Sequence, residues 1–179
     1  MKNFIFFFII TSFFFNSCTK HQENKTNEKV FDVTIDLEDE FLNIESTKQK
    51  DHALNGDYYS SVDSIKIYGA GYSKKIVDSL KNNNLEVIIS AWLRESKTPN
   101  EGVIAFSLNG INGEIKDWKT IAVQPDKFSP SIWCKLQDTI RYDANTVSSA
   151  NLLKIFGMKQ NGSDSLDIDD VKIKFRFYK

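Results

Sequence analysis

The sequence predicts an all-β domain over residues 30–179, built as an antiparallel two-sheet sandwich or as a barrel. First, every second residue of the segment 31–37 is apolar, and a strand with one buried face has this period of two. Second, four of the eight glycines follow an asparagine, a pair that suits the positive φ angles of tight hairpins. Third, a helical spacing of apolar residues is confined to one short stretch, residues 74–81. Short strands joined by such turns favour two packed sheets or a closed sheet.

Strand-like segments follow one another along the domain, separated by turn residues. They are residues 31–37, 65–68, 85–93, 103–108, 118–123, 132–142, 152–158 and 171–177. The part 87–93 is apolar on both faces, which predicts an interior strand. All three prolines, Pro99, Pro125 and Pro130, lie between these segments, as expected of a residue that cannot donate a hydrogen bond to a sheet.

The first seventeen residues predict an export signal. One lysine precedes residues 4–15, which are apolar except for Thr11 and Ser12. A helix of twelve residues spans roughly 18 Å, whereas the hydrocarbon core of a bilayer is roughly 30 Å thick. The segment is therefore too short to span a membrane and has the form of a signal peptide.

The end of this apolar segment, Phe15 to Cys18, resembles the lipobox of bacterial lipoproteins. Ser17 and Cys18 fit that pattern, while Phe15 and Asn16 depart from its usual residues. The resemblance implies that Cys18 carries lipid and anchors the protein to the membrane of the bacterial cell envelope, the outer membrane being the expected one. The alternatives are an ordinary cleaved signal, in which Cys18 is incidental, and an uncleaved short anchor.

Residues 18–29 predict a flexible tether between the lipid and the domain, because from residue 19 onward all of them are polar or charged. The second cysteine, Cys134, alternates with apolar residues, which indicates a small buried side chain. With Cys18 lipidated, the mature chain has no pair of cysteines for a disulfide. The formal net charge of −1 argues against nucleic acid as a partner, because nucleic-acid binding needs a basic face.

Several segments, taken in order, resemble the jelly-roll β-sandwich of carbohydrate-binding modules with a galactose-binding-like fold. They are residues 35–38, 53–56 followed by 59–62, 87–93, Trp118-Lys119, Trp133, 153–156 and 168–171. The resemblance implies a jelly-roll sandwich that binds carbohydrate without catalysis. Two features depart from it: Asn55 stands where such modules usually carry serine, and no catalytic domain adjoins.

The resemblance also implies a structural Ca²⁺ that ties the first strand to the last. The matching positions are Glu38, the backbone near residues 56–58, and Asp169 or Asp170. Calcium takes six to eight oxygen ligands and accepts carboxylates and backbone carbonyls. The alternative is that these acidic residues are solvated strand ends in a chain with 24 acidic residues.

For sugar contacts, the resemblance directs attention to exposed aromatic rings with polar neighbours. Trp92 and Arg94 share a strand face with Ser90, and Tyr72 and Trp118 lie beside turns. These four residues are the expected carbohydrate-binding set. The alternative for each ring is a place in the core with its polar atom satisfied, which is what we expect of Trp133.

Three functions remain open from the sequence. The first is a non-catalytic envelope lipoprotein that binds glycan, and the second is an accessory lipoprotein that binds another envelope protein. The third, a polysaccharide-degrading enzyme, would need facing carboxylates or a Tyr, His and Arg cluster. The sequence has three arginines, a single histidine outside the tether, His52, and no phosphate-loop, nucleophile-elbow or zinc motif.

Overall fold

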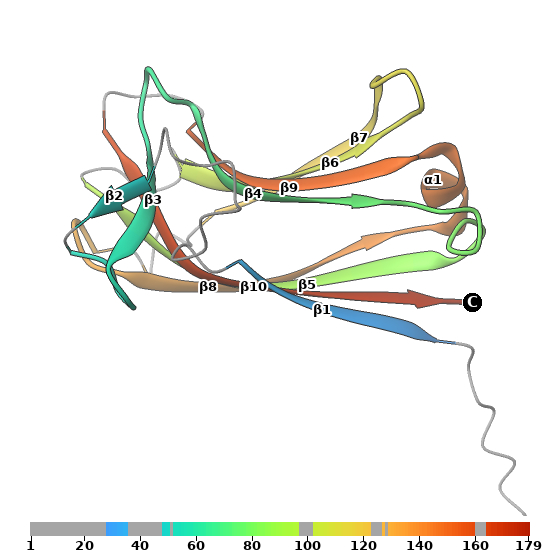
Figure 1. The fold of residues 1–179 in the computed structure, drawn as a ribbon, viewed down its shortest axis with the longest axis horizontal. Coiled ribbons are helices and arrows are strands. Elements are labelled where there is room, and N and C mark those ends of the chain that lie inside the picture. Colours follow the sequence, from blue (N-terminus) through green and yellow to red (C-terminus); the bar gives the residue numbers. More distant parts are fainter. Residues whose placement is uncertain are drawn as a thin grey trace, which may run out of the picture.

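Alternating side chains fold this chain into two antiparallel sheets that pack face to face, seen as the upper and lower layers of Figure 1. The computed structural model describes residues 28–35, 48–50, 52–96, 102–122, 127, 129–159 and 164–179. The predicted signal peptide, Cys18, nearly all of the tether and Glu38 lie outside the described residues. The prediction of an all-β, two-sheet antiparallel sandwich is confirmed.

The first sheet has six strands. In spatial order they are β2 (Lys48–Lys50), β3 (Tyr58–Val62), β10 (Leu166–Tyr178), β5 (Asn84–Glu95) and β8 (Cys134–Tyr142), and β1 (Lys29–Ile35) also pairs with β10. β10 serves both β3 and β1 because it is long: its first residues pair with β3, and those from Val171 onward pair with β1. A register shift between Asp169 and Lys172 separates the two parts, where Asp170 has a φ of 46°.

The second sheet has four strands and forms the upper layer of Figure 1. In spatial order they are β4 (Tyr68–Lys75), β9 (Leu152–Lys159), β6 (Gly102–Asn109) and β7 (Ile115–Ile121). The one helix among the described residues, α1 (Ala144–Ser149), links β8 of the first sheet to β9 of the second.

The core lies between the two sheets. β5 is an interior strand, as its apolar sequence predicted, and its inward residues are fully buried. Phe175 and Phe177 of β10 face the same interior, as do Phe106 of β6 and Ile155 of β9. Each such side chain contributes about 2 kcal/mol through burial, so the alternation read from the sequence is what holds the layers together.

Local hydrogen bonds explain where the observed elements differ from the predicted ones. Residues 65–68 were expected as a strand, but the Asp63 carboxylate accepts the backbone N–H groups of Ile65 and Lys66, both at 2.7 Å, and makes a turn there. Helix α1 was not predicted. It begins after Asp143, whose side chain accepts the N–H of Thr146 and caps the helix.

Within the described residues, no helix has both the length and the apolar character needed to cross a membrane.

Candidate functional site

Three aromatic rings meet on the outer face of the second sheet, the face turned away from the core. Phe156 lies between the other two: its ring centroid is 5.5 Å from that of Tyr68 and 5.7 Å from that of Trp118. The rings come from β4, β9 and β7, at interplanar angles of 76° and 60°. We call Tyr68, Phe156 and Trp118 the aromatic cradle.

Strand register places these rings together. Trp118 pairs with Ser107 on β6, and Ser107 pairs with Lys154 on β9, so the three side chains form a row across the sheet. On β9, Lys154 and Phe156 point outward while the residues between and beside them are buried. The middle strand, β6, offers small side chains outward, which leaves a hollow between the larger side chains on either side.

The hollow has a volume of about 380 Å³, within the range of ligand pockets. Its lining combines aromatic, aliphatic and polar side chains: Tyr68, Ser107, Asn109, Ile115, Trp118, Lys154 and Phe156. The Ser107 hydroxyl donates to Oδ1 of Asn109 (2.9 Å), and the Asn109 amide donates to the carbonyl of Gly113 (3.2 Å). These bonds tie the floor of the hollow to the β6–β7 hairpin, which rises above the upper layer in Figure 1.

Gly71 on β4 lies against Phe156, where a larger residue would clash with it. It pairs with Phe156, and a Cβ atom at this position would lie 2.9 Å from the Cβ of Phe156 and 2.9 Å from the carbonyl oxygen of Ile155. The register of β4 shifts between Tyr68 and Gly71. This irregularity turns the Tyr68 ring toward Phe156, although Ala70 and Tyr72 of the same strand pack against the core.

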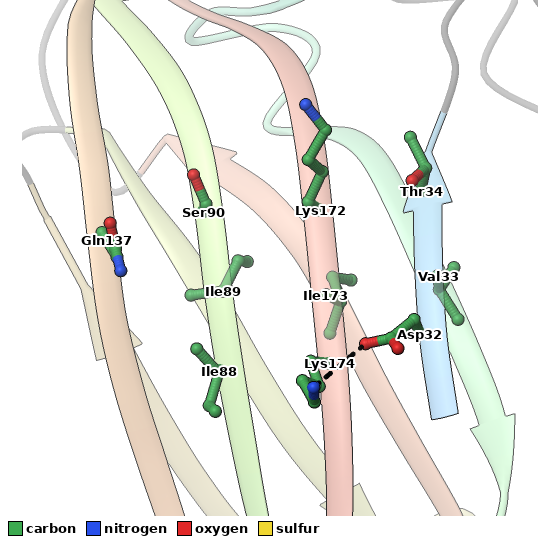
Figure 2. A pocket seen from close by; sticks show the side chains of 10 residues that line it. All are labelled: Asp32, Val33, Thr34, Ile88, Ile89, Ser90, Gln137, Lys172, Ile173 and Lys174. Carbon is green, nitrogen blue, oxygen red and sulfur yellow. Dashed lines mark ion pairs between the residues drawn. The ribbon is translucent and has the colours of Figure 1, made fainter. Parts of the chain in front are cut away.

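The outer face of the first sheet has a second hollow, of about 270 Å³. Figure 2 shows its lining side chains from four neighbouring strands, with Ser90 on β5, Gln137 on β8, Lys172 on β10 and Thr34 on β1 in one row. The two lysines among them, Lys172 and Lys174, have carboxylate partners at 2.9 and 4.0 Å. Polar and aliphatic side chains line this hollow, and none of its described lining residues is aromatic.

Arg94 is held at one end of this same face. Its guanidinium nitrogens lie 3.0 and 2.9 Å from Oδ2 of Asp167, and its central carbon lies 4.6 Å from the ring centroid of Trp133 and 5.2 Å from that of Tyr59. The expectation that Trp133 lies in the core is wrong, because its ring packs against Arg94 and Tyr59 on this outer face. Alternation along the chain gives the physical reason: Trp133 is two residues from the exposed Lys135, so both point to the outer face.

The four residues expected to contact sugar therefore occupy three places. Trp118 is in the aromatic cradle, while Trp92 and Arg94 lie on the outer face of the first sheet. Tyr72 lies between the sheets, with its ring centroid 5.7 Å from that of Phe175. The structure brings Trp92 and Arg94 together on one strand and separates both from Trp118.

Sequence reasoning missed two members of the cradle. Phe156 is not among the expected residues, yet its spacing of two from Lys154 assigns it to the solvent face. Tyr68 was overlooked because the tyrosine after the glycine-rich segment, Tyr72, was chosen instead of the one before it. The register shift at Tyr68 has no clear signature in the sequence.

Asp169 joins the last strand to Leu54 and Asn55, which directly precede the residues 56–58 of the calcium prediction. Its Oδ2 accepts the backbone N–H groups of Leu54 (2.8 Å) and Asn55 (3.1 Å), and its Oδ1 accepts that of Asp170 (2.7 Å). A carboxylate has about four lone-pair sites, so these three bonds leave little capacity for a metal ion.

The second acidic residue of the predicted calcium site has a partner as well. The Asp170 carboxylate is paired with Lys172 at 2.9 Å. Among the described residues, no group of three or more metal-ligating side chains is found. Because Glu38 lies outside the described residues, the calcium site stays a prediction.

Comparison with solved structures finds proteins that are similar to this chain. The CBM22-1 xylan-binding domain of Xyn10C from Paenibacillus barcinonensis has a TM-score of 0.50 at 16% identity, over 82% of this chain and 94% of that domain. Family 16 Carbohydrate Binding Module-2 has a TM-score of 0.43 at 15% identity, over 70% of this chain and 82% of that one. The infectious bursal disease virus Gx strain structure has a TM-score of 0.48 at 11% identity, over 85% of this chain and 33% of that one.

At these identities the likeness concerns the fold alone. No family model matches the sequence, and no curated protein matches it. The chain therefore has the jelly-roll β-sandwich fold, which it shares with the xylan-binding domain over nearly the whole length of that domain.

Proposed function

We propose that this protein binds carbohydrate at the aromatic cradle, without catalysing its breakdown, as a lipid-anchored protein of the bacterial cell envelope. The observation that carries the proposal is the meeting of Tyr68, Phe156 and Trp118 over a hollow that also contains Ser107 and Lys154. A sugar ring has apolar C–H faces and a rim of hydroxyl groups. Aromatic rings suit the faces, and hydroxyl, amide and ammonium groups suit the rim.

The exposure of these rings supports a binding role. Tyr68 is 57% exposed and Trp118 is 39% exposed, on a sheet face that in a sandwich is usually polar. Grouped exposed apolar side chains on a soluble domain are typical of interaction sites. A fold is compatible with many functions, so the likeness to a xylan-binding domain supports the proposal less than the cradle does.

The N-terminal segment supplies the proposed location. A lipid on Cys18 would hold the sandwich at a membrane, and two or more acyl chains bind a bilayer far more stably than a single chain. The polar tether of residues 18–29 would then let the cradle reach glycan near that membrane.

A glycan array tests the proposal. The protein without residues 1–18 is applied as wild type, Trp118→Ala and Trp92→Ala, the last being a matched tryptophan on the opposite sheet. We expect wild type and Trp92→Ala to bind the same glycans and Trp118→Ala to lose at least about tenfold in affinity, because it loses the largest ring of the cradle. Silence of the wild type on every glycan, or unchanged binding by Trp118→Ala, would contradict the proposal.

A protein partner is the second candidate, and one observation favours it. Ile111 and Ile115 of the β6–β7 hairpin are 82% and 61% exposed beside the cradle. A photo-crosslinking amino acid at position 111 in living cells tests this candidate: one recurrent crosslinked envelope protein, together with a silent glycan array, would favour it over glycan binding.

A further inference from the structure

A lysine, Lys154, also lines the hollow at the aromatic cradle, and the described residues offer its charge no opposite charge. Lys154 lines the hollow, in the same row across the sheet as Ser107 and Trp118. Its side chain is exposed, and within the described parts of the chain its ammonium group has no ion-pair or hydrogen-bond partner. A ligand in the cradle would therefore lie beside a free positive charge.

The carboxylates of the β6–β7 hairpin have lysine partners of their own. Glu114, in the turn of the β6–β7 hairpin, pairs with Lys116 at 3.0 Å. Asp117 pairs with Lys119 at 3.7 Å. None of the described residues that line the cradle is acidic.

The hollow on the outer face of the first sheet shows the opposite arrangement. The cations that line it are paired, and the Lys174–Asp32 pair is the dashed line in Figure 2. At the far end of that face, Glu86 accepts from both Arg141 (2.8 Å) and Arg176 (2.9 Å). The two hollows thus differ in charge as well as in aromatic content.

The residue type alone would mean little, because the chain has 20 lysines. Lys154 differs from the other lysines because it lines the hollow, where a bound ligand would cover its ammonium group. A neutral ligand that covered this ammonium would remove water from it without replacing the lost solvation by an opposite charge. A carboxylate or sulfate on the ligand would form a charge-assisted hydrogen bond instead, which is shorter and stronger than a neutral one.

We propose that the cradle selects an anionic glycan, whose carboxylate or sulfate group binds the Nζ of Lys154 while Trp118 and Tyr68 contact its sugar rings. This inference rests on the proposed function and adds the substrate class to it. The acidic group has to lie on the edge of a sugar that faces β9, because Lys154 approaches the hollow from that strand.

Affinity gel electrophoresis with matched polymers tests the inference. The gels contain carboxymethylcellulose or hydroxyethylcellulose, polygalacturonate or its methyl ester, and dextran sulfate or dextran. Within each pair the backbone is constant and the charge differs, and the three pairs distinguish carboxylate from sulfate. We expect a charged polymer to retard the wild-type protein at least about tenfold more strongly than its neutral partner, and we expect this retardation to decrease with added salt.

Two lysine variants test whether the preference for the charged polymer depends on Lys154. Lys154→Met keeps the length of the side chain and removes its charge. Lys135→Met makes the same change at an exposed lysine of the first sheet, for which the described residues also offer no ion-pair partner. We expect Lys154→Met to lose the preference for the charged polymer and Lys135→Met to keep it, with both variants folded as judged by circular dichroism.

The outcomes separate this inference from the function on which it rests. Equal retardation by neutral and charged polymers that depends on Trp118 would overturn the inference and leave glycan binding in place. Equal losses in the two lysine variants would also overturn it. If no polymer retards the wild type and the glycan array is silent, both proposals fail.

Discussion

Trp118 and Phe156 lie on strands that are not neighbours, β7 and β9, yet their ring centroids are 5.7 Å apart above β6. This contact is available because the β6 residues that pair with the two rings are small: Ser107 pairs with Trp118 and Ala105 with Phe156. Because the two rings touch above β6, they form the walls of a hollow whose lining includes Ser107.

Replacing Phe156 tests whether the three rings act together. Phe156 contacts both other rings, so Phe156→Ala leaves Tyr68 and Trp118 without their common support. We expect glycan affinity to fall by at least about tenfold, and the free energy of unfolding to fall by about 2 kcal/mol because the ring is half-buried. Phe156→Leu restores most of the apolar volume and separates the two effects: stability should recover while affinity stays low. Full affinity in Phe156→Ala, measured by calorimetry, would show that Phe156 has no part in binding.

Replacing Asp169 should lower the free energy of unfolding more than replacing most other polar residues. Asp169→Ala leaves the backbone N–H groups of Leu54 and Asn55 without their acceptor, and we expect a loss of about 3 kcal/mol in urea unfolding. Asp170→Asn is the control, because asparagine tolerates the φ of 46° and only a surface ion pair is lost, which costs about 0.5 kcal/mol. Similar losses in both variants would contradict this role of Asp169.

The calcium prediction is tested separately. An ion that binds only the folded state stabilises it by an amount that grows with the logarithm of the ion concentration above its Kd, so calcium should raise the melting temperature of the wild type relative to a chelator. Glu38→Gln should abolish that rise, because Glu38 is the predicted ligand on the first strand. The same melting temperature in calcium and in chelator would exclude a structural calcium ion.

Helix α1 should make the domain sensitive to acid. The backbone N–H of Thr146, and then its hydroxyl, donate to the Asp143 carboxylate and lower its pKa from the ordinary 3.8. A carboxyl whose pKa is lower in the folded state stabilises the fold above its unfolded pKa, and this contribution disappears as the pH falls through the folded pKa. Asp143→Asn keeps an acceptor without the charge, so its urea midpoint should fall less than that of the wild type between about pH 5 and about pH 3. An equal fall in both proteins would assign the acid sensitivity to other carboxylates.

Lipidation of Cys18 is tested by metabolic labelling with palmitate. We expect label in the wild type and in Cys134→Ala, and none in Cys18→Ala, which should also leave the membrane fraction. Cys134 is a suitable control because the structure places it, partly buried against the core, at the start of β8. Label that persists in Cys18→Ala would contradict the anchor.

The sandwich could be predicted because its cause is local. Alternation in β1 and β10 and the two-sided apolar run of β5 depend on neighbouring residues only, and each appears in the structure as expected. The position of Asp169 beside Leu54, 115 residues away in the chain, has no such local cause. The family resemblance nevertheless placed the neighbouring residues 56–58 beside the last strand, through a calcium site that stays a prediction.

The cradle could be predicted only in part, because it depends on three strand registers at once. Trp118 was identified from its place beside a turn, and the spacing of Lys154 and Phe156 contained the information for a second ring. The alignment of β7, β6 and β9, which places Trp118, Ser107 and Lys154 in one row, is a property of the assembled sheet. The shift that turns Tyr68 outward is likewise a property of the β4–β9 pairing.

The three tryptophans allow glycan binding at the aromatic cradle to be tested in one experiment. The indole N–H signals of Trp92, Trp118 and Trp133 are assigned by single Trp→Phe variants and followed by nuclear magnetic resonance during titration with an oligosaccharide that binds on the array. Because Trp118 lies in the cradle and the other two lie on the opposite sheet, we expect the Trp118 signal to shift with saturation and the other two to stay in place. Shifts at Trp92 or Trp133 with an unchanged Trp118 signal would contradict it.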